Sequence, residues 1–261
     1  MSDTPILQMK GINKSFGPVH VLHDVDFNVY PGEVMALVGD NGAGKTTLIK
    51  CLAGIYPIDS GEILIDGELV HIHGPREAAA LGIEFVYQDL ALCDNLDIVQ
   101  NMFLGREQRK RPFRNLDESS MEKRARATLA GLSVRTVSSV RQVVASLSGG
   151  QRQTVAIAKA VLWNNRVVVL DEPTAALGVA QTKQVLDLVR RLADAGHGVI
   201  LISHNMNDVM QVADRVTALY LGRIAGEVKA SEVTHAQVVE LITAGRSGSI
   251  GLAPSTAAES A

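Results

Sequence analysis

The sequence predicts an α/β protein in which helices cover a mainly parallel sheet, with an antiparallel β layer near the N-terminus and a helical insertion in the middle. Three apolar runs, at 33–39, 167–172 and 198–204, show no alternation and end in polar residues or glycine. Strands buried on both faces of a parallel sheet have this pattern. The β pattern then disappears between about 89 and 160, where helical patterns replace it.

The antiparallel layer is predicted from short β-type runs at 6–12, 25–29 and 61–67, which are separated by Gly, Pro and Asp. From Arg246 onward the chain contains Ser, Gly, Ala, Thr and Pro without periodicity, which is typical of disorder. We therefore expect one domain over 1–245, with a helical subdomain at approximately 89–160, and a disordered tail over 246–261.

Composition excludes several classes of protein. Hydrophobic residues make up 46% of the 261 residues, which supports a sizeable core, and a net charge of −3 gives no general attraction to nucleic acid. No apolar run approaches the roughly 18 residues that span a bilayer, and the N-terminus lacks a signal-peptide pattern. We expect a cytosolic protein that reaches a membrane only through a partner. The isolated Cys51 and Cys93 are expected to be reduced packing residues.

A phosphate site is predicted where residues 39–46 read GDNGAGKT, between a strand and the helix-forming stretch 48–55. This is the P-loop pattern in its strand, loop, helix context, so the fold predicted is a P-loop NTPase core. Glycines let backbone N–H groups converge on a polyphosphate at a helix N-terminus. Lys45 is expected at the β- and γ-phosphates, Thr46 at Mg²⁺ and Thr47 at the α-phosphate. The predicted nucleotide-binding residues are Gly39, Asp40, Asn41, Gly42, Ala43, Gly44, Lys45, Thr46 and Thr47.

The run VVVLDE at 167–172 predicts the second half of the site, because a buried strand ending in two acids places carboxylates beside the P-loop. Asp171 is expected to hold Mg²⁺, usually through water. Glu172 is expected to orient the attacking water and partly deprotonate it. Apolar strands that end in acidic residues are common, so this run predicts a Mg²⁺ and water site only in combination with the P-loop.

The sequence LSGGQ at 147–151, followed by RQTVAIAKAV and then by the acidic strand, resembles the signature of ABC (ATP-binding cassette) ATPases. The resemblance covers about 6–245 and implies an ABC nucleotide-binding domain that uses ATP and Mg²⁺. In that family the signature serves the ATP held by the opposite subunit, which implies a head-to-tail homodimer. The residues that would contact this nucleotide are Ser148, Gly149, Gly150 and Gln151.

Other positions fit the same resemblance. Phe16 matches the aromatic residue that stacks on adenine, Gln88 matches the Q-loop residue that contacts Mg²⁺ and water, and His204 matches the switch histidine at the γ-phosphate. The segment 175–178 departs from the family pattern, because it reads A-A-L-G where S-A-L-D is usual. The missing acid puts in doubt the contact by which one site senses the other.

Within the family, the stretch 94–107 together with EPTAALGV resembles the ATPases of bacterial monosaccharide importers, such as those for ribose, xylose or fructose. This implies a homodimer on the cytoplasmic face of the plasma membrane, bound to two permease subunits and fed by a periplasmic sugar-binding protein. It implies no nucleic-acid partner.

Three alternatives remain open. The chain could serve an ABC exporter, or it could be a soluble ABC ATPase acting on nucleic acid or ribosomes. The soluble versions carry long coiled-coil insertions or two linked cassettes, which we do not expect here. A P-loop kinase or GTPase outside this family is the third alternative, although a GTPase needs an N-K-x-D motif and Asn13-Lys14 is followed by Ser and Phe.

Overall fold

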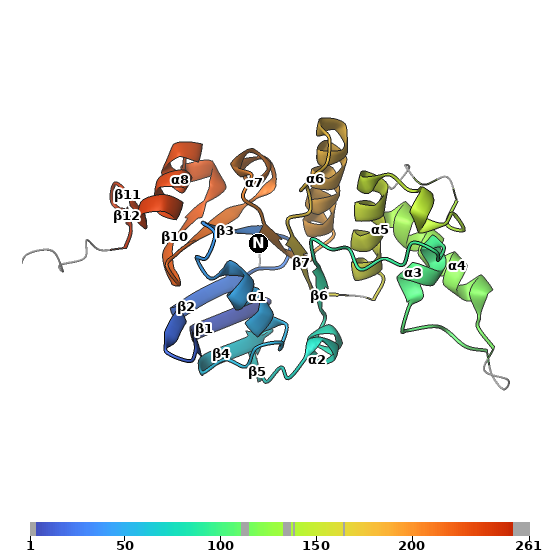
Figure 1. Cartoon of the computed structure of the whole chain (residues 1–261), viewed down its shortest axis with the longest axis horizontal. Helices are drawn as coiled ribbons and strands as arrows, with labels where there is room; N and C mark the ends of the chain where they lie inside the picture. Colours follow the sequence, from blue (N-terminus) through green and yellow to red (C-terminus); the bar gives the residue numbers. More distant parts are fainter. Residues whose placement is uncertain (1–3, 111–114, 133–136, 138, 164, 253–261) are drawn as a thin grey trace, which may run out of the picture.

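A six-stranded sheet forms the centre of the molecule (Figure 1). The computed structural model describes residues 4–110, 115–132, 137, 139–163 and 165–252. The strand order is β10-β9-β3-β8-β7-β6, and every neighbouring pair is parallel except β9 with β10. The strands are β3 Val34–Gly39, β6 Ile83–Val86, β7 Val167–Asp171, β8 Gly198–Ile202, β9 Arg215–Tyr220 and β10 Arg223–Lys229.

Both faces of this sheet are covered, which explains the unbroken apolar runs. Val167 and Val169 of β7 face a core shared with the N-terminal sheet, whereas Val168 and Leu170 face a core shared with the helices. The predicted strands at 33–39, 167–172 and 198–204 are therefore confirmed as β3, β7 and β8. The helices around the sheet are α1 Lys45–Leu52, α2 Pro75–Ala80, α6 Val179–Asp194, α7 Met206–Val212 and α8 His235–Ala244, with a 3₁₀ turn η2 at Ala230–Glu232.

A four-stranded antiparallel sheet packs with α1 against one face of the central sheet. Its order is β2-β1-β4-β5, and Phe27, Leu48 and Ile63 belong to the shared core. The predicted antiparallel layer is confirmed, with longer strands than the sequence indicates. Its strands are β1 Leu7–Phe16, β2 Val19–Val29, β4 Ser60–Ile65 and β5 Glu68–Val70.

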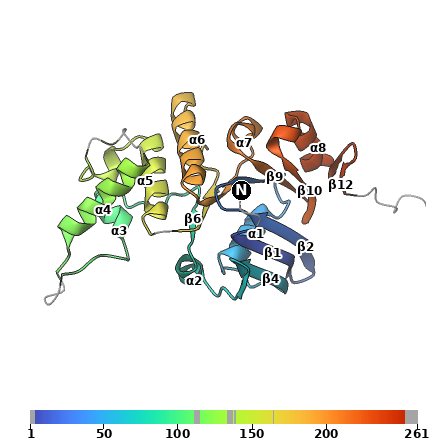
Figure 2. The same cartoon turned by 180° about the vertical axis from the view of Figure 1, so that it is seen from behind.

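The stretch between β6 and β7 is helical, as the sequence predicts, and it lies to one side of the central sheet in both views (Figures 1 and 2). Its described residues form no strand, only the isolated bridges Asp97–Val143 and Arg109–Leu116. The limits of a subdomain at about 89–160 and of a domain at 1–245 stay predictions. The helices here are α3 Ile98–Phe103, α4 Glu118–Gly131 and α5 Gly149–Val161, with a 3₁₀ turn η1 at Val144–Ser146.

The expected disordered tail from residue 246 is wrong in its first part. Arg246–Ser247 (β11) pairs with Ile250–Gly251 (β12), and Leu252 N–H donates to Gly245 O at 2.9 Å. Ile250 packs against the core around α8, and the Ser247 hydroxyl donates to Glu240. These contacts order a β-hairpin that the residue composition of this stretch does not indicate. Residues 253–261 lie outside the described part of the chain.

Two further expectations concern the surroundings of the protein. Both cysteines are free, with Cys51 buried and Cys93 half-buried. No helix in the described ranges combines the length and the apolar character needed to cross a membrane.

Candidate active site

The glycine loop begins where β3 ends and leads directly into α1. Gly42 and Gly44 have φ values of +83° and +109°, which L-residues with side chains rarely adopt. A Cβ on Gly44 would lie 2.9 Å from Leu22 Cδ2, and one on Gly39 would lie 2.5 Å from the carbonyl oxygen of Leu219. Glycine is therefore required because the loop presses against β2 and β9.

A cavity of about 310 Å³ lies over this loop. Residues 41–47 and Val21 of β2 line it, so loop amides and the start of α1 border one concave space. This arrangement fits a polyphosphate, because backbone N–H groups at a helix N-terminus attract anions. Val21 was not predicted, and nothing in its local sequence distinguishes it from the apolar residues around it.

Lys45 lies across the loop rather than pointing into solvent. Its Nζ donates to the carbonyl oxygens of Gly39 at 2.7 Å and Asp40 at 3.0 Å. Burial lowers the pKa of Lys45, and the negative charges of Glu172, Asp40 and Asp171 oppose that shift. The ammonium group is thus held at the loop by uncharged acceptors that a phosphate oxygen could replace.

The two predicted acids follow β7 at the same edge of the sheet. Burial raises the pKa of Asp171, and the charge of Glu172 raises it further, whereas Lys45 and Lys50 oppose the shift. Because oxygen ligands suit Mg²⁺, the carboxylate of Asp171 with the hydroxyl of Thr46 fits that ion. Such paired acids next to a lysine make a charged site that a cation and a polyphosphate would complete.

Glu172 has an unusual backbone and a fixed partner. Its φ of +50° is rare for a residue with a side chain, and its N–H donates to Ile202 O at 2.9 Å. The Glu172 carboxylate accepts the His204 N–H at 3.1 Å, and His204 Nδ1 lies 2.8 Å from the same oxygen. The His204 side chain is 75% exposed and that of Glu172 only 17%. The strained turn therefore aims Glu172 at the residue that follows β8.

Gln88 and Phe16 lie at the borders of this edge. Gln88 is exposed just beyond β6, which neighbours β7, so it follows the same edge of the sheet as Asp171. Phe16 is exposed at the end of β1 and contacts Tyr56 edge-on, with 5.0 Å between ring centroids. Lys14 Nζ lies over the Phe16 ring, 5.4 Å from its centroid, so the ring has a cation as well as Tyr56 beside it.

The signature residues are not brought to the glycine loop. Ser148 caps α5, where its Oγ accepts the Gln151 N–H at 3.3 Å and the Gln151 side chain accepts the Ser148 N–H at 2.9 Å. Ser148 and Gly149 are exposed. Figure 1 shows α5 apart from α1, with β6 and β7 between them, and Figure 2 shows the same separation of α5 and α1 from behind. Within one chain, the predicted site residues therefore form two separate groups.

The residue Leu177 before α6 and the first turn of α6 pack against this signature. A Cβ on Gly149 would lie 3.3 Å from Leu177, and one on Gly150 would lie 3.0 Å from Gln181. Gly178 caps α6 with an ordinary φ of −73°, and its N–H donates to Gln181 Oε1 at 3.4 Å. Nothing lies within 4 Å of a Cβ built on Gly178. The position thus accepts a side chain without strain.

Comparison with known proteins shows which family shares these features. A family model described as "ABC transporter" matches residues 22–175. The fructose import ATP-binding protein FrcA of Rhizobium meliloti is 45% identical, over 93% of this chain and 95% of that protein. The xylose/arabinose import ATP-binding protein XylG of Sulfolobus acidocaldarius is 40% identical, over 97% and 98%. The ribose import ATP-binding protein RbsA 1 of Rubrobacter xylanophilus is 46% identical over 87% of this chain, which spans 44% of that protein.

Solved structures share the fold. A nucleotide-free ATP-binding cassette from an ABC transporter superposes with a TM-score of 0.78 at 23% identity, over 92% of this chain and 95% of that one. The cbiO1 protein of Clostridium perfringens, part of an ABC transporter complex, gives a TM-score of 0.76 at 27% identity, over 91% and 93%. The predicted fold class is therefore confirmed.

We predict that Glu172→Gln lowers the rate of ATP hydrolysis by roughly 10²- to 10⁴-fold, because an amide cannot accept the proton of the attacking water. The amide oxygen can still accept the His204 N–H, so ATP binding and folding should be preserved. Steady-state hydrolysis and ATP affinity measure the two effects. Asp194→Asn is the control, because it removes an exposed carboxylate that pairs with Arg190 on α6. Near-normal turnover of Glu172→Gln would remove Glu172 from the role of base.

Proposed function

This chain belongs to the ABC transporter family of ATP-binding proteins, and we propose that it hydrolyses ATP to drive the import of a monosaccharide through partner permease subunits. The observation that carries the proposal is that Lys45, Asp171 and Glu172 share one edge of the sheet at the glycine loop. The names of FrcA, XylG and RbsA 1 support the direction of transport and the class of substrate.

The contacts of Lys45, Glu172 and His204 support the roles proposed here. Backbone amides of residues 39–47 and the ammonium group of Lys45 bind the phosphates beside Val21, while Phe16 stacks on the base. Asp171, Thr46 and Gln88 would hold Mg²⁺, which neutralises charge on the phosphates when it is bound. Glu172 takes a proton from the attacking water, and His204 orients the Glu172 carboxylate from the neighbouring strand. His204 is exposed enough to contact the γ-phosphate as well.

A homodimer is proposed because the signature and the glycine loop lie apart within one chain. Ser148 and Gly149 are exposed at the N-terminus of α5, and with the amide of the buried Gly150 they offer donors suited to the γ-phosphate of a nucleotide held elsewhere. In a head-to-tail pair, each signature would complete the site of the other chain. Gln151 would support it by holding the backbone of Ser148.

The other proposed partners follow from the family. Two permease subunits and a periplasmic or extracellular sugar-binding protein would complete the importer, and the chain would sit on the cytoplasmic face of the plasma membrane. An exporter, or a soluble ATPase acting on nucleic acid or ribosomes, is disfavoured because the relatives named above are import proteins. The net charge of −3 also gives no support for a nucleic-acid partner.

Import is tested by uptake in cells that lack this chain. We expect such cells to lose uptake of at least one labelled monosaccharide, and we expect the unaltered chain, but not Glu172→Gln, to restore it. Uptake of an amino acid serves as the control. Unchanged uptake of every monosaccharide, together with reduced efflux of any solute, would favour the exporter instead.

Mixed dimers test the exchange of signatures between chains. When one chain carries Ser148→Arg and the other Lys45→Ala, one composite site stays whole, so the dimer should hydrolyse ATP although either variant alone does not. The matched control places both substitutions in the same chain beside an unaltered partner, which should ruin both sites. If the control is the active dimer, each chain uses its own signature and the head-to-tail arrangement is wrong.

Gly178→Asp tests how the two ATP sites communicate. An aspartate and a glycine cap helices almost equally well, and space is open here, so the melting temperature should hardly change. The acid could add a charge-assisted hydrogen bond across the dimer, which contributes roughly 1.5 to 3 kcal/mol when partly desolvated. The Hill coefficient of ATP hydrolysis in the assembled transporter should then change, whereas Gly178→Ser, which lacks the charge, should change it less. An unaltered coefficient would make Gly178 a neutral helix cap.

A further inference from the structure

Gln88 lies in the loop that follows β6, called here the Gln88 loop. The segment after this loop runs antiparallel to the segment that precedes the signature. Residues 94–99 and 140–145 lie side by side, with the bridge between Asp97 and Val143 at the centre. The two segments are therefore joined through their backbones, although they are far apart in sequence. The hydrogen bonds are Ala145 N to Asp94 O at 2.9 Å, Val144 N to Leu96 O at 3.0 Å, Ile98 N to Gln142 O at 3.2 Å and Val99 N to Val140 O at 3.2 Å.

One end of this pairing is held by Arg152, in the first turn of α5. Its guanidinium donates to Asp94 Oδ1 at 2.8 Å, to Ala145 O at 3.1 Å and to Leu147 O at 3.3 Å. Arg152 N–H also donates to the carbonyl oxygen of Ser148 at 2.9 Å. The Arg152 side chain thus joins the segment after Gln88 to Ala145 and Leu147, which directly precede the signature serine.

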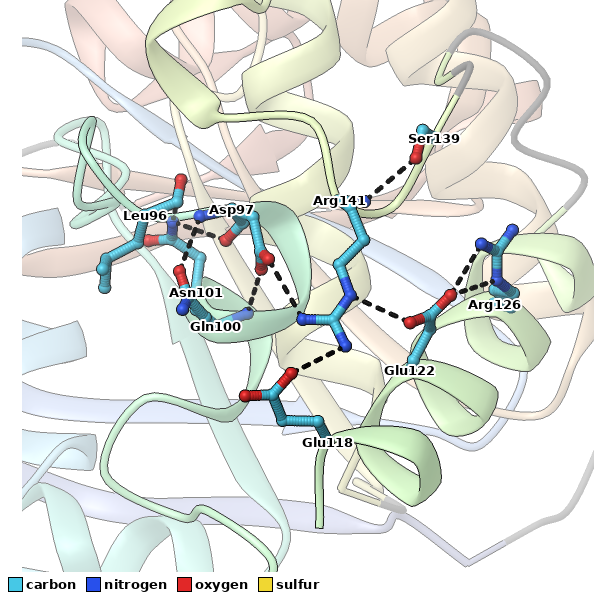
Figure 3. Close-up of polar contacts among 9 residues, drawn as sticks. All are labelled: Leu96, Asp97, Gln100, Asn101, Glu118, Glu122, Arg126, Ser139 and Arg141. Atoms are coloured by element: carbon cyan, nitrogen blue, oxygen red, sulfur yellow. Dashed lines mark hydrogen bonds and ion pairs between the residues drawn. The ribbon is translucent and has the colours of Figure 1, made fainter. Parts of the chain in front are cut away.

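The other end is held by Arg141 (Figure 3). Its guanidinium contacts Asp97 at 3.3 Å and, on α4, Glu122 at 2.9 Å and Glu118 at 3.3 Å. Asp97 also caps α3 by accepting the Gln100 N–H at 2.7 Å. The segment 94–97 is therefore fixed to α4 at one end and to α5 at the other.

The chain between Gln88 and Asp94 is anchored to the same body. Leu90 and Leu92 pack against the helical core, and Cys93 N–H donates to the fully buried side chain of Asn101 at 2.7 Å. These contacts attach residues 90–93 to the helical part directly beside residues 94–97, so we expect a displacement of the Gln88 loop to reach them. The Arg152 side chain links Asp94 to Ala145 and Leu147, the residues just before Ser148.

We propose that Arg152 is a positioning residue which, through Asp94, sets the position of Ser148 according to the position of the Gln88 loop. This inference rests on the proposed function, because it matters only if Ser148 contacts a nucleotide. A role in stability alone would be small, since Asp94 is 64% exposed and exposed ion pairs contribute little to folding. The rate of hydrolysis is far more sensitive than folding stability to the loss of this ion pair, because small misplacements of a catalytic contact greatly reduce rates.

The test is a double-mutant cycle in the full chain with Asp94→Ala, Arg152→Ala and the two combined. We expect each single variant to lower kcat for ATP hydrolysis about tenfold, because the signature is misplaced. ATP affinity should stay within about twofold, because the glycine loop is untouched. The double variant should be no slower than the slower single variant, since both remove the same tie.

A second readout does not depend on turnover. In nucleotide-free protein, Asp94→Ala should speed hydrogen exchange of the amides of residues 145–151, while exchange in α1 stays unchanged. Arg126→Ala is the matched control, because this arginine pairs with Glu122 in the same subdomain but touches neither segment end. It should behave like the unaltered chain in both measurements.

Each outcome separates this inference from the proposed function. If Ser148→Arg keeps normal hydrolysis, the role of the signature is wrong and the inference falls with it. If Ser148→Arg abolishes hydrolysis while Asp94→Ala keeps normal kcat and exchange, the proposed function survives and the positioning role of Arg152 is overturned. Losses that multiply in the double variant would overturn it as well. Because Asp94 is exposed, Asp94→Ala decides the matter even if Arg152→Ala folds poorly.

Discussion

The parallel pairing of β3 with β8, and of β8 with β7, is the constraint on which the rest of the structure depends. Parallel neighbours place all their carboxyl ends at one edge, so the residues that follow each strand must meet there. The glycine loop follows β3, His204 follows β8, and Asp171 and Glu172 end β7. Both faces of β3, β7 and β8 are covered, so their side chains are apolar until the residues that end or follow each strand at this edge.

Lys45 and Asp171 stabilise each other's charge at this edge of the sheet in the absence of a nucleotide. Burial disfavours the charged forms of both Lys45 and Asp171, while each is stabilised by the charge of the other. The Glu172 carboxylate contacts His204 and acts on Lys45 only through its charge, which is the largest of those that oppose the lowering of the Lys45 pKa. Lys45 therefore rests on backbone carbonyl oxygens, which a phosphate can displace without breaking an ion pair.

The helical part is constrained differently, because its signature at the start of α5 is exposed and is held by residues that are distant in sequence. The signature is capped by its own residues, Ser148 and Gln151. Its connection to the chain after Gln88 is made by Arg152, Arg141 and a short backbone pairing. The apolar side chains of the helical part share one core with α6 and the central strands, so the exposed signature is built on a buried support.

The sequence by itself determined the strands β3, β7 and β8, the glycine loop and the signature, because each depends on neighbours along the chain. Burial on both faces leaves an unbroken apolar run, and the left-handed positions of the phosphate loop, Gly42 and Gly44, favour glycine. Only the tertiary structure decided that Val21 lines the phosphate cavity, that Ser247 and Ile250 order a hairpin, and that Asp94 meets Arg152. Those contacts join residues far apart in sequence, so they depend on how the layers pack and leave no local periodicity to find.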